Sequence, residues 1–241
     1  MPIGIILNSL AILLGGIVGA AIGKKIPAAI RTSLPLVFGC CAMMMGITNI
    51  IKMKTMPAVV LALIIGTIIG ELLKLEDAFQ KVGAFFGPKV AKLFGGQSEM
   101  DENHITDFVS TLVLFCASGT GIFGAMQSGL NGDHTLLITK AILDFFTAAI
   151  MAVTVGYLTA FISIPQTVIF LALFFSAKLL MPIISDVMLA DFMCCGGVLV
   201  LAAGFRVAKV KNFPISSMVP AMILVMPVSA AWNAWILPLF G

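Results

Sequence analysis

The sequence predicts an all-α integral membrane protein, a polytopic bundle of about eight transmembrane helices. Hydrophobic residues fill 60% of the 241 positions and charged residues only 10%, so too few charges are available to cover a water-soluble surface. Apolar runs of about 20 residues, the length needed to cross a bilayer, recur along the whole chain. These runs do not alternate with period two, which favours helices over a β-barrel.

The first run has neither a basic start nor an Ala-x-Ala cleavage site, so we interpret it as a retained span rather than a signal peptide. It carries small residues at intervals of four, namely Ala11, Gly15, Gly19 and Gly23, a stripe typical of close helix packing. We expect one integral membrane domain over residues 1–241. The expected spans are 3–23, 34–51, 57–74, 107–130, 136–159, 165–182, 190–206 and 214–238.

The one long connection, residues 75–106, is predicted to hold an amphipathic helix and then a polar linker. Its apolar residues recur at three- and four-residue intervals on one helical face: Phe79, Val82, Phe86, Val90 and Leu93. Its lysines lie off that face. The pattern fits a basic helix on the cytoplasmic membrane surface, and it fits a cytoplasmic lid packed on the bundle equally well.

The distribution of Lys and Arg predicts the orientation. If the N-terminus lies outside, Lys52 and Lys54 are the two cations in outward loops, and Lys140 and Lys178 fall near or inside spans. The other Lys and Arg residues all fall in inward loops. We therefore expect both termini outside and residues 75–106 in the cytoplasm.

Two segments of the sequence resemble each other. Phe38-Gly-Cys-Cys is followed by Gly46, Lys52, Lys54 and Pro57, and Phe192-Met-Cys-Cys by Gly204, Lys209, Lys211 and Pro214. As an internal repeat, spans one to three would correspond to spans six to eight and would run in the opposite sense across the membrane, as in many secondary transporters. Chance similarity between hydrophobic helices is the alternative.

The fourth span is interrupted near its centre by Ser118, Gly119, Thr120 and Gly121. Glycine weakens a helix, and Ser and Thr can bond to freed backbone groups. A broken helix at membrane depth exposes donors and acceptors that can hold a solute or an ion. Gln127, about two turns further on, adds an amide. A tightly packed glycine-rich helix is the alternative interpretation.

The fifth span carries Lys140 and Asp144, four residues apart on one helical face. Ionisable groups at this depth are costly and usually face a polar cavity or pair with each other. The two residues are therefore candidates for a functional site, with a purely structural ion pair as the alternative. Asp133 stands where an N-cap is expected.

Several stretches of the chain resemble the bacterial membrane family called domain of unknown function 554. They are GIILNSLAILLGGIVGAAIGKKIP, IIGTIIGELL, the stretch from Cys116 through GDHT to Lys140 and Asp144, and KNFPISSMVPA. The family pattern often has an acidic residue after the glutamine, where this chain has Ser128. The resemblance implies a multi-pass protein of the bacterial cytoplasmic membrane and suggests transport.

We expect a secondary transporter or permease of a small solute or ion, with Ser118–Gly121, Gln127, Lys140 and Asp144 lining the site. Asp144 would carry a coupling proton or cation. A gated channel would use the same polar lining, and a membrane scaffold or sensor is the alternative from another class. The sequence has no Ser–His–acid or metal-ligand pattern, so we expect no enzyme, no catalytic residue, no metal and no cofactor. The expected partners are membrane lipids and the solute or ion. A second copy of the chain is a further candidate, and nucleic acid is not expected.

Overall fold

The computed structural model describes residues 1–22, 25, 27–78, 81, 108, 111–112, 115–116 and 118–239. Within this part of the chain all regular secondary structure is helical. The chain forms two compact units: unit 1 comprises residues 1–35 and 77–178, and unit 2 comprises residues 36–76 and 179–241. That residues 1–241 act as a single membrane domain stays a prediction.

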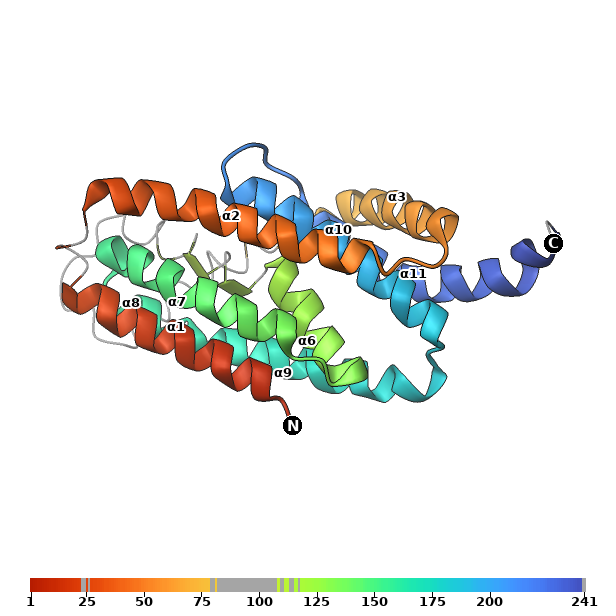
Figure 1. The fold of residues 1–241 in the computed structure, drawn as a ribbon, viewed down its shortest axis with the longest axis horizontal. Coiled ribbons are helices and arrows are strands. Elements are labelled where there is room, and N and C mark those ends of the chain that lie inside the picture. The colour runs from red at the N-terminus through yellow and green to blue at the C-terminus, as the bar shows by residue number, and fades with distance from the viewer. Residues whose placement is uncertain are drawn as a thin grey trace. The chain divides into compact units, whose positions relative to one another are not determined.

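Unit 1 is built around the contact between its first helix and α7, which lie side by side in Figure 1. Its elements are α1 (Ile3–Ile22), α6 (Gly119–Asn131), α7 (Thr135–Val155), α8 (Leu158–Phe161) and α9 (Ser163–Leu180). A Cβ atom on Gly15 or Gly19 would overlap the backbone of α7 at Phe145 or Ala149. The small-residue stripe of α1 is therefore a packing surface, because only glycine lets the two backbones approach this closely.

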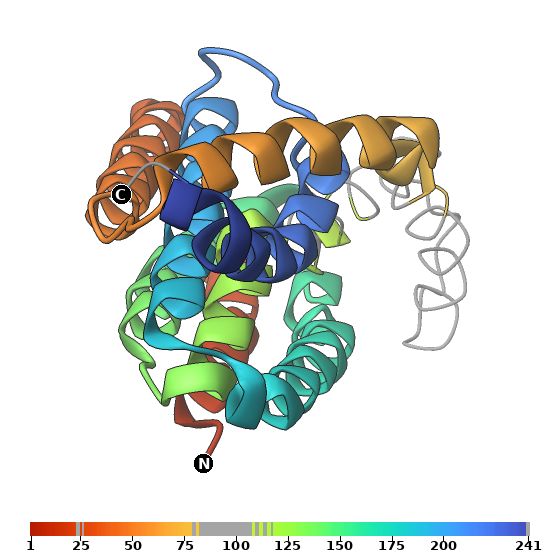
Figure 2. The same ribbon diagram turned by 90° about the vertical axis from the view of Figure 1, so that its right-hand side faces the viewer.

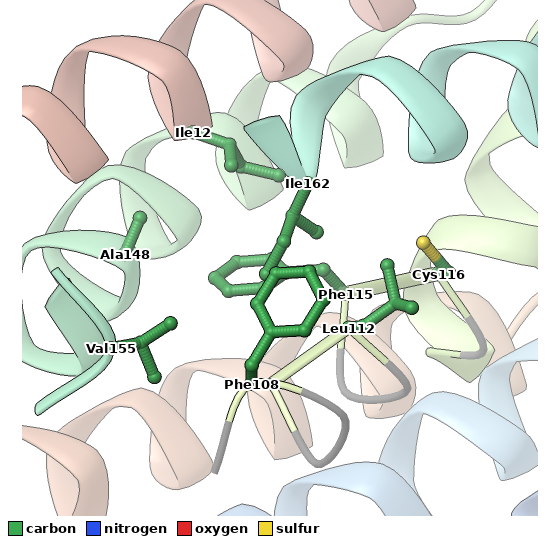
Figure 3. Close-up of a cluster of buried hydrophobic side chains, with 8 residues drawn as sticks. All are labelled: Ile12, Phe108, Leu112, Phe115, Cys116, Ala148, Val155 and Ile162. Carbon is green, nitrogen blue, oxygen red and sulfur yellow. The ribbon is translucent and has the colours of Figure 1, made fainter. Parts of the chain in front are cut away.

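A cluster of buried apolar side chains fills unit 1 beside this contact (Figure 3). Its members are Ile12, Phe108, Leu112, Phe115, Cys116, Ala148, Val155 and Ile162. A second cluster consists of Ile5, Ala125, Leu137, Phe170 and Phe174. The two clusters join α1, α7 and α9, the helices that carry the polar groups described below.

Unit 2 contains two close helix pairs. Its elements are α2 (Ala28–Ile50, from residue 36 on), α3 (Met56–Leu72), η2 (Met181–Ile183), α10 (Asp186–Val207), α11 (Ile215–Ala231), the π-helical η3 (Trp232–Ile236) and η4 (Leu237–Leu239). Glycines of α3 pack on the backbone of α11, Gly66 against Ala221 and Gly70 against Ser217. In Figure 2, α3 and α11 lie next to each other. As the residue number increases along α3, the number of the residue contacted in α11 decreases, so the two helices are antiparallel.

The second close pair of unit 2 is formed by α2 and α10. A Cβ atom on Gly39 would lie 2.7 Å from the carbonyl oxygen of Gly204, and one on Gly46 would lie 2.7 Å from the carbonyl oxygen of Gly197. The reciprocal distances are equally short, at 2.8 Å from Gly204 to Gly39 and 2.7 Å from Gly197 to Gly46. This pair is also antiparallel and held at backbone contact.

The surfaces of these helices are apolar, as a bilayer requires. On α1, Ile6, Leu10, Leu14 and Ile17 recur at helical spacing and all are exposed, whereas Asn8 on the opposite face is fully buried. A water-soluble helix has the reverse arrangement. Apolar side chains facing outward and a polar one facing inward indicate a lipid environment.

Six helices in the described part of the chain are long and apolar enough to cross a membrane: Ile3–Ile22, Ala28–Ile50, Thr135–Val153, Leu158–Leu179, Asp186–Val207 and Ile215–Leu239. The all-α multi-pass architecture is confirmed. The predicted count of eight spans is not, because α3 has 17 residues and the span expected at 107–130 is described only in part. Most of the segment predicted at 75–106, with its amphipathic helix, lies outside the described residues.

Candidate functional site

Helix α6 begins within the predicted fourth span. Cys116 is helical, Ser118 has extended backbone angles (φ −71°, ψ 128°), and α6 starts at Gly119. The Ser118 hydroxyl accepts a hydrogen bond of 3.0 Å from the backbone N–H of Gly121, so this serine is the N-cap. Regular helix is therefore interrupted where the Ser-Gly-Thr-Gly sequence predicts it.

Lys140 and Asp144 form a buried ion pair on α7. The Lys140 ammonium lies 2.5 Å from Asp144 Oδ2, and the two side chains are only 6% and 9% exposed. Their helical spacing puts both groups on the inner face of α7. The pairing predicted from the sequence is present.

A chain of amides extends this pair across α1 to α9. Asn8 of α1 donates a hydrogen bond of 2.8 Å to Asp144 Oδ2. Gln166 of α9 donates one of 2.6 Å to Asn8 Oδ1. Asn8 and Gln166 are both completely buried. The polar cluster therefore joins three helices, and we call Asn8, Lys140, Asp144 and Gln166 the unit 1 polar cluster.

The carboxylate sets the direction of every hydrogen bond in this cluster. Ionised Asp144 can only accept, so Asn8 must present its NH₂ group to it. Asn8 Oδ1 then faces α9 and must receive the NH₂ group of Gln166. Gln166 Oε1 is consequently turned away, and it is buried with no hydrogen-bond partner among the described residues. Asp144 Oδ1 likewise has none there.

Lys140 also touches an aromatic ring. Its ammonium lies 5.8 Å from the centre of the Phe115 ring, within the range of a cation–π contact. Phe115 lies three residues before the N-cap of α6. Among the described residues, this contact connects the ion pair to the segment that precedes the interruption.

The other predicted site residues take separate positions in unit 1. Thr120 is buried near the start of α6, and Gly121 packs against the ring of Phe170 in α9. Gln127 donates a hydrogen bond of 2.8 Å to Asp133, and its Oε1 is buried with no partner among the described residues. Among the described residues, no hydrogen bond joins Gln127 to the unit 1 polar cluster.

Sequence reasoning missed Gln166 and did not include Asn8 in the candidate site. The internal repeat predicted from the sequence offered one signal for Gln166. Gln166 follows Asn8 by 158 positions, the distance that also separates Gly46 from Gly204. A search for polar residues at that spacing would have found the pair.

A second buried carboxylate, also missed, lies in unit 2. Asp191 of α10 is completely buried. Its Oδ1 accepts hydrogen bonds from the backbone N–H groups of Lys54 (2.9 Å) and Thr55 (2.7 Å). Its Oδ2 accepts one of 2.6 Å from the Ser229 hydroxyl. With both oxygens engaged, Asp191 holds the turn before α3 against α10 and α11.

Clusters of three or more His, Cys, Asp or Glu side chains that could hold a metal ion do not occur in the described part of the chain. The polar atoms of the unit 1 polar cluster are instead a carboxylate, two amides and an ammonium. Carboxylate and amide oxygens are hard ligands of the kind that alkali and alkaline-earth cations prefer.

A comparison with known proteins identifies the family. The model of the family described as "Protein of unknown function (DUF554)" matches residues 3–230. The chain belongs to this family. The DUF554 chain is 44% identical over 237 residues to "Uncharacterized protein YqgA" of Escherichia coli (strain K12), with 98% of this chain and 99% of the relative covered. It is 25% identical over 229 residues to "Uncharacterized membrane protein YdfK" of Bacillus subtilis (strain 168), with 92% and 93% covered.

No solved structure matches the chain. The family resemblance predicted from the sequence is confirmed, and it extends over nearly the whole length. The six apolar helices of the described residues, together with a relative named as a membrane protein, indicate that this DUF554 chain is a multi-pass membrane protein.

Proposed function

We propose that this protein is a secondary transporter of the bacterial cytoplasmic membrane, which moves a small solute or ion and couples the movement to a cation at Asp144. One observation carries the proposal: the buried carboxylate of Asp144 forms an ion pair with Lys140 and is linked by hydrogen bonds through Asn8 to Gln166. The coupling cation is a proton or a metal ion.

The cost of this arrangement favours function over structure. Removing a carboxylate and an ammonium from water costs several kcal/mol per ion, and their mutual attraction seldom exceeds that cost. Apolar residues of similar size would hold α1, α7 and α9 together at least as well. A charged pair retained at such a position is therefore a candidate for ion binding.

The position of the cluster also supports transport. Asn8 and Gln166 are 158 positions apart and bonded to each other. Their neighbours Ser9 and Thr167 are also 158 positions apart, and a hydrogen bond connects their hydroxyl groups. We propose that α1 and α9 are counterparts in an internal repeat, in which case the cluster lies where the two repeats meet. Transporters with inverted repeats bind their substrates at that interface.

The glycine contacts of unit 2 follow the same spacing. Gly39 and Gly197 are 158 positions apart, and so are Gly46 and Gly204. The repeat counterpart of Gly39 is Gly197, and that of Gly204 is Gly46. The Gly39–Gly204 contact therefore has the Gly197–Gly46 contact as its counterpart. The antiparallel course of α2 and α10 supports an inverted relation between the repeats.

We assign the remaining predicted residues to the solute path. The N-cap at Ser118 and the first turn of α6, Gly119 to Gly121, place backbone N–H groups at an interrupted span, where transporters bind polar groups. Gln127 adds a buried carbonyl oxygen without a partner among the described residues.

Reconstituted protein can test the proposal. Proteoliposomes containing a trapped pH dye or sodium dye would receive, one at a time, amino acids, carboxylic acids, sugars and nucleosides. We expect one class to drive cation entry in the wild type. Asp144→Asn, which keeps the size and a hydrogen-bonding group, should abolish the dye signal while remaining folded and inserted.

Three results would contradict parts of this proposal. Normal coupled flux by Asp144→Asn would show that Asp144 does not bind the coupling cation. Flux that shows no counterflow, the exchange of internal for external solute, would identify a channel. A protein that moves none of these solutes, yet co-purifies with a partner protein, would fit a scaffold or sensor.

A further inference from the structure

We propose that the unit 1 polar cluster binds a monovalent alkali cation, held by Asp144 Oδ1 and Gln166 Oε1, and that Lys140 is a built-in competitor for it. This proposal deepens the proposed function, because it names the coupling ion, and it rests on the same site. Its test measures binding at equilibrium and needs no flux.

Two oxygen atoms of the cluster are available to a ligand. Gln166 is completely buried, and its Oε1 has no hydrogen-bond partner among the described residues. Asp144 Oδ1 receives no bond there, because Asn8 and Lys140 both bind Oδ2. The lack of a donor is costly for Gln166 Oε1, because this atom is buried. In the proposed site, these two oxygen atoms are the protein ligands of the cation.

The Gln166 amide cannot turn over to relieve this cost. Asp144 fixes the orientation of Asn8, and Asn8 fixes that of Gln166, as derived above. Turning Gln166 would bring its oxygen against Asn8 Oδ1, so that two acceptors would face each other. The unpartnered carbonyl is therefore a consequence of the charge on Asp144.

The charge of the cluster selects a monovalent ion. Lys140 and Asp144 together are neutral, so binding one monovalent cation leaves a single excess positive charge. A divalent cation would leave two such charges in a low-dielectric surrounding, at a much higher desolvation cost. Carboxylate and carbonyl oxygens suit hard cations rather than transition metals.

Lys140 is already paired with the Asp144 carboxylate to which the cation would bind. Its ammonium is 2.5 Å from Asp144 Oδ2, and an arriving cation must weaken that bond. The ring face of Phe115, 5.8 Å from the ammonium, offers Lys140 a second partner when it withdraws. Binding of the cation would thus be an exchange with a tethered positive group.

The test uses purified full-length protein in detergent at fixed pH and ionic strength. Thermal unfolding is recorded while NaCl, LiCl or KCl replaces N-methylglucamine chloride. A ligand that binds the folded state raises the apparent Tm in a saturable way. We expect such a rise for at least one alkali cation in the wild type.

Three variants separate the roles. Asp144→Asn should remove the cation-dependent rise. Gln166→Leu should weaken the apparent affinity by about tenfold or more, which corresponds to about 1.4 kcal/mol of binding free energy. Lys140→Met should be less stable without alkali cation and should bind it more tightly, by about tenfold or more. Tighter binding would not follow from a merely structural pair.

Thr159→Val is the matched control. Thr159 of α8 is completely buried in unit 1, and its hydroxyl has no hydrogen-bond partner among the described residues. Its replacement should leave the cation response unchanged. Loss of the response in this variant, or its survival in Asp144→Asn, would overturn the proposal, as would identical unfolding in all four chlorides for both the wild type and Lys140→Met.

The two proposals fail separately. Cation binding in detergent without flux in proteoliposomes would leave this site intact and reject the transporter. Solute flux driven by a pH gradient, with no alkali-cation effect on stability, would support the transporter and reject the alkali site in favour of a proton.

Discussion

Asn8 and Gln166 lie 158 residues apart in the chain and are joined by a hydrogen bond of 2.6 Å between their side-chain amides. Both are completely buried, in helices whose outer faces are apolar. Asn8 is also the group through which α9 is connected to the carboxylate of Asp144. This amide therefore occupies the centre of the polar cluster, and its removal should disturb both neighbours.

Asn8→Leu should destabilise the protein by between about 1 and 3 kcal/mol for each buried polar group that loses its partner. Asp144 would lose a donor and Gln166 its acceptor. Thermal unfolding in detergent would measure the loss. Thr139→Val on α7 is the control, because that exposed hydroxyl bonds only to the backbone of its own helix at Thr135, and a comparable loss there would remove the special role of Asn8.

Gly121→Ala should destabilise unit 1 by between about 1 and 3 kcal/mol, the usual range for overpacking a core. A Cβ atom on Gly121 would meet the ring of Phe170, which is buried on α9 one turn after Gln166. Phe170→Leu in the same chain should restore part of the loss. A double-mutant cycle measures this coupling, and strict additivity of the two changes would show that the predicted overlap is absent.

Asp191→Ala should destabilise unit 2 more than Asp191→Asn. The alanine leaves the N–H groups of Lys54 and Thr55 and the Ser229 hydroxyl without acceptors, at about 1 to 3 kcal/mol for each of these groups that is buried, whereas asparagine keeps one carbonyl oxygen. Unfolding temperatures in detergent would rank the variants. Asp186→Asn, an exposed change in the first turn of the same helix, should have little effect. Equal stability of wild type and Asp191→Ala would contradict the anchoring role.

Labelling should find both termini outside the cytoplasm and the segment 75–106 inside it. The prediction rests on Lys and Arg, which concentrate in the loops assigned to the cytoplasm. Single cysteines placed near each end and within the segment, in a background without native cysteines, would be exposed to a membrane-impermeant maleimide in intact cells. Protection of the two ends, with labelling of the segment, would reverse the orientation.

The sequence by itself determined the class of this protein and part of its candidate site. Apolar runs long enough to cross a bilayer can satisfy their backbone only as helices, so an all-α membrane protein followed without any tertiary information. Lys140 and Asp144 were identified because helical spacing alone puts residues four apart on one face. The interruption at Ser118 followed from local preferences of Ser and Gly.

Only the tertiary structure decided which distant groups meet. The local sequence does not distinguish Gln166 from a glutamine at the membrane surface, or Asp191 from an aspartate that caps the start of a helix. The hydrogen-bond partners of both residues lie in other parts of the chain. The same holds for Gly39 and Gly204, whose contact depends on how two helices cross. Long-range contacts form where packing and hydrogen bonding are satisfied together, and that condition belongs to the folded chain rather than to any segment of it.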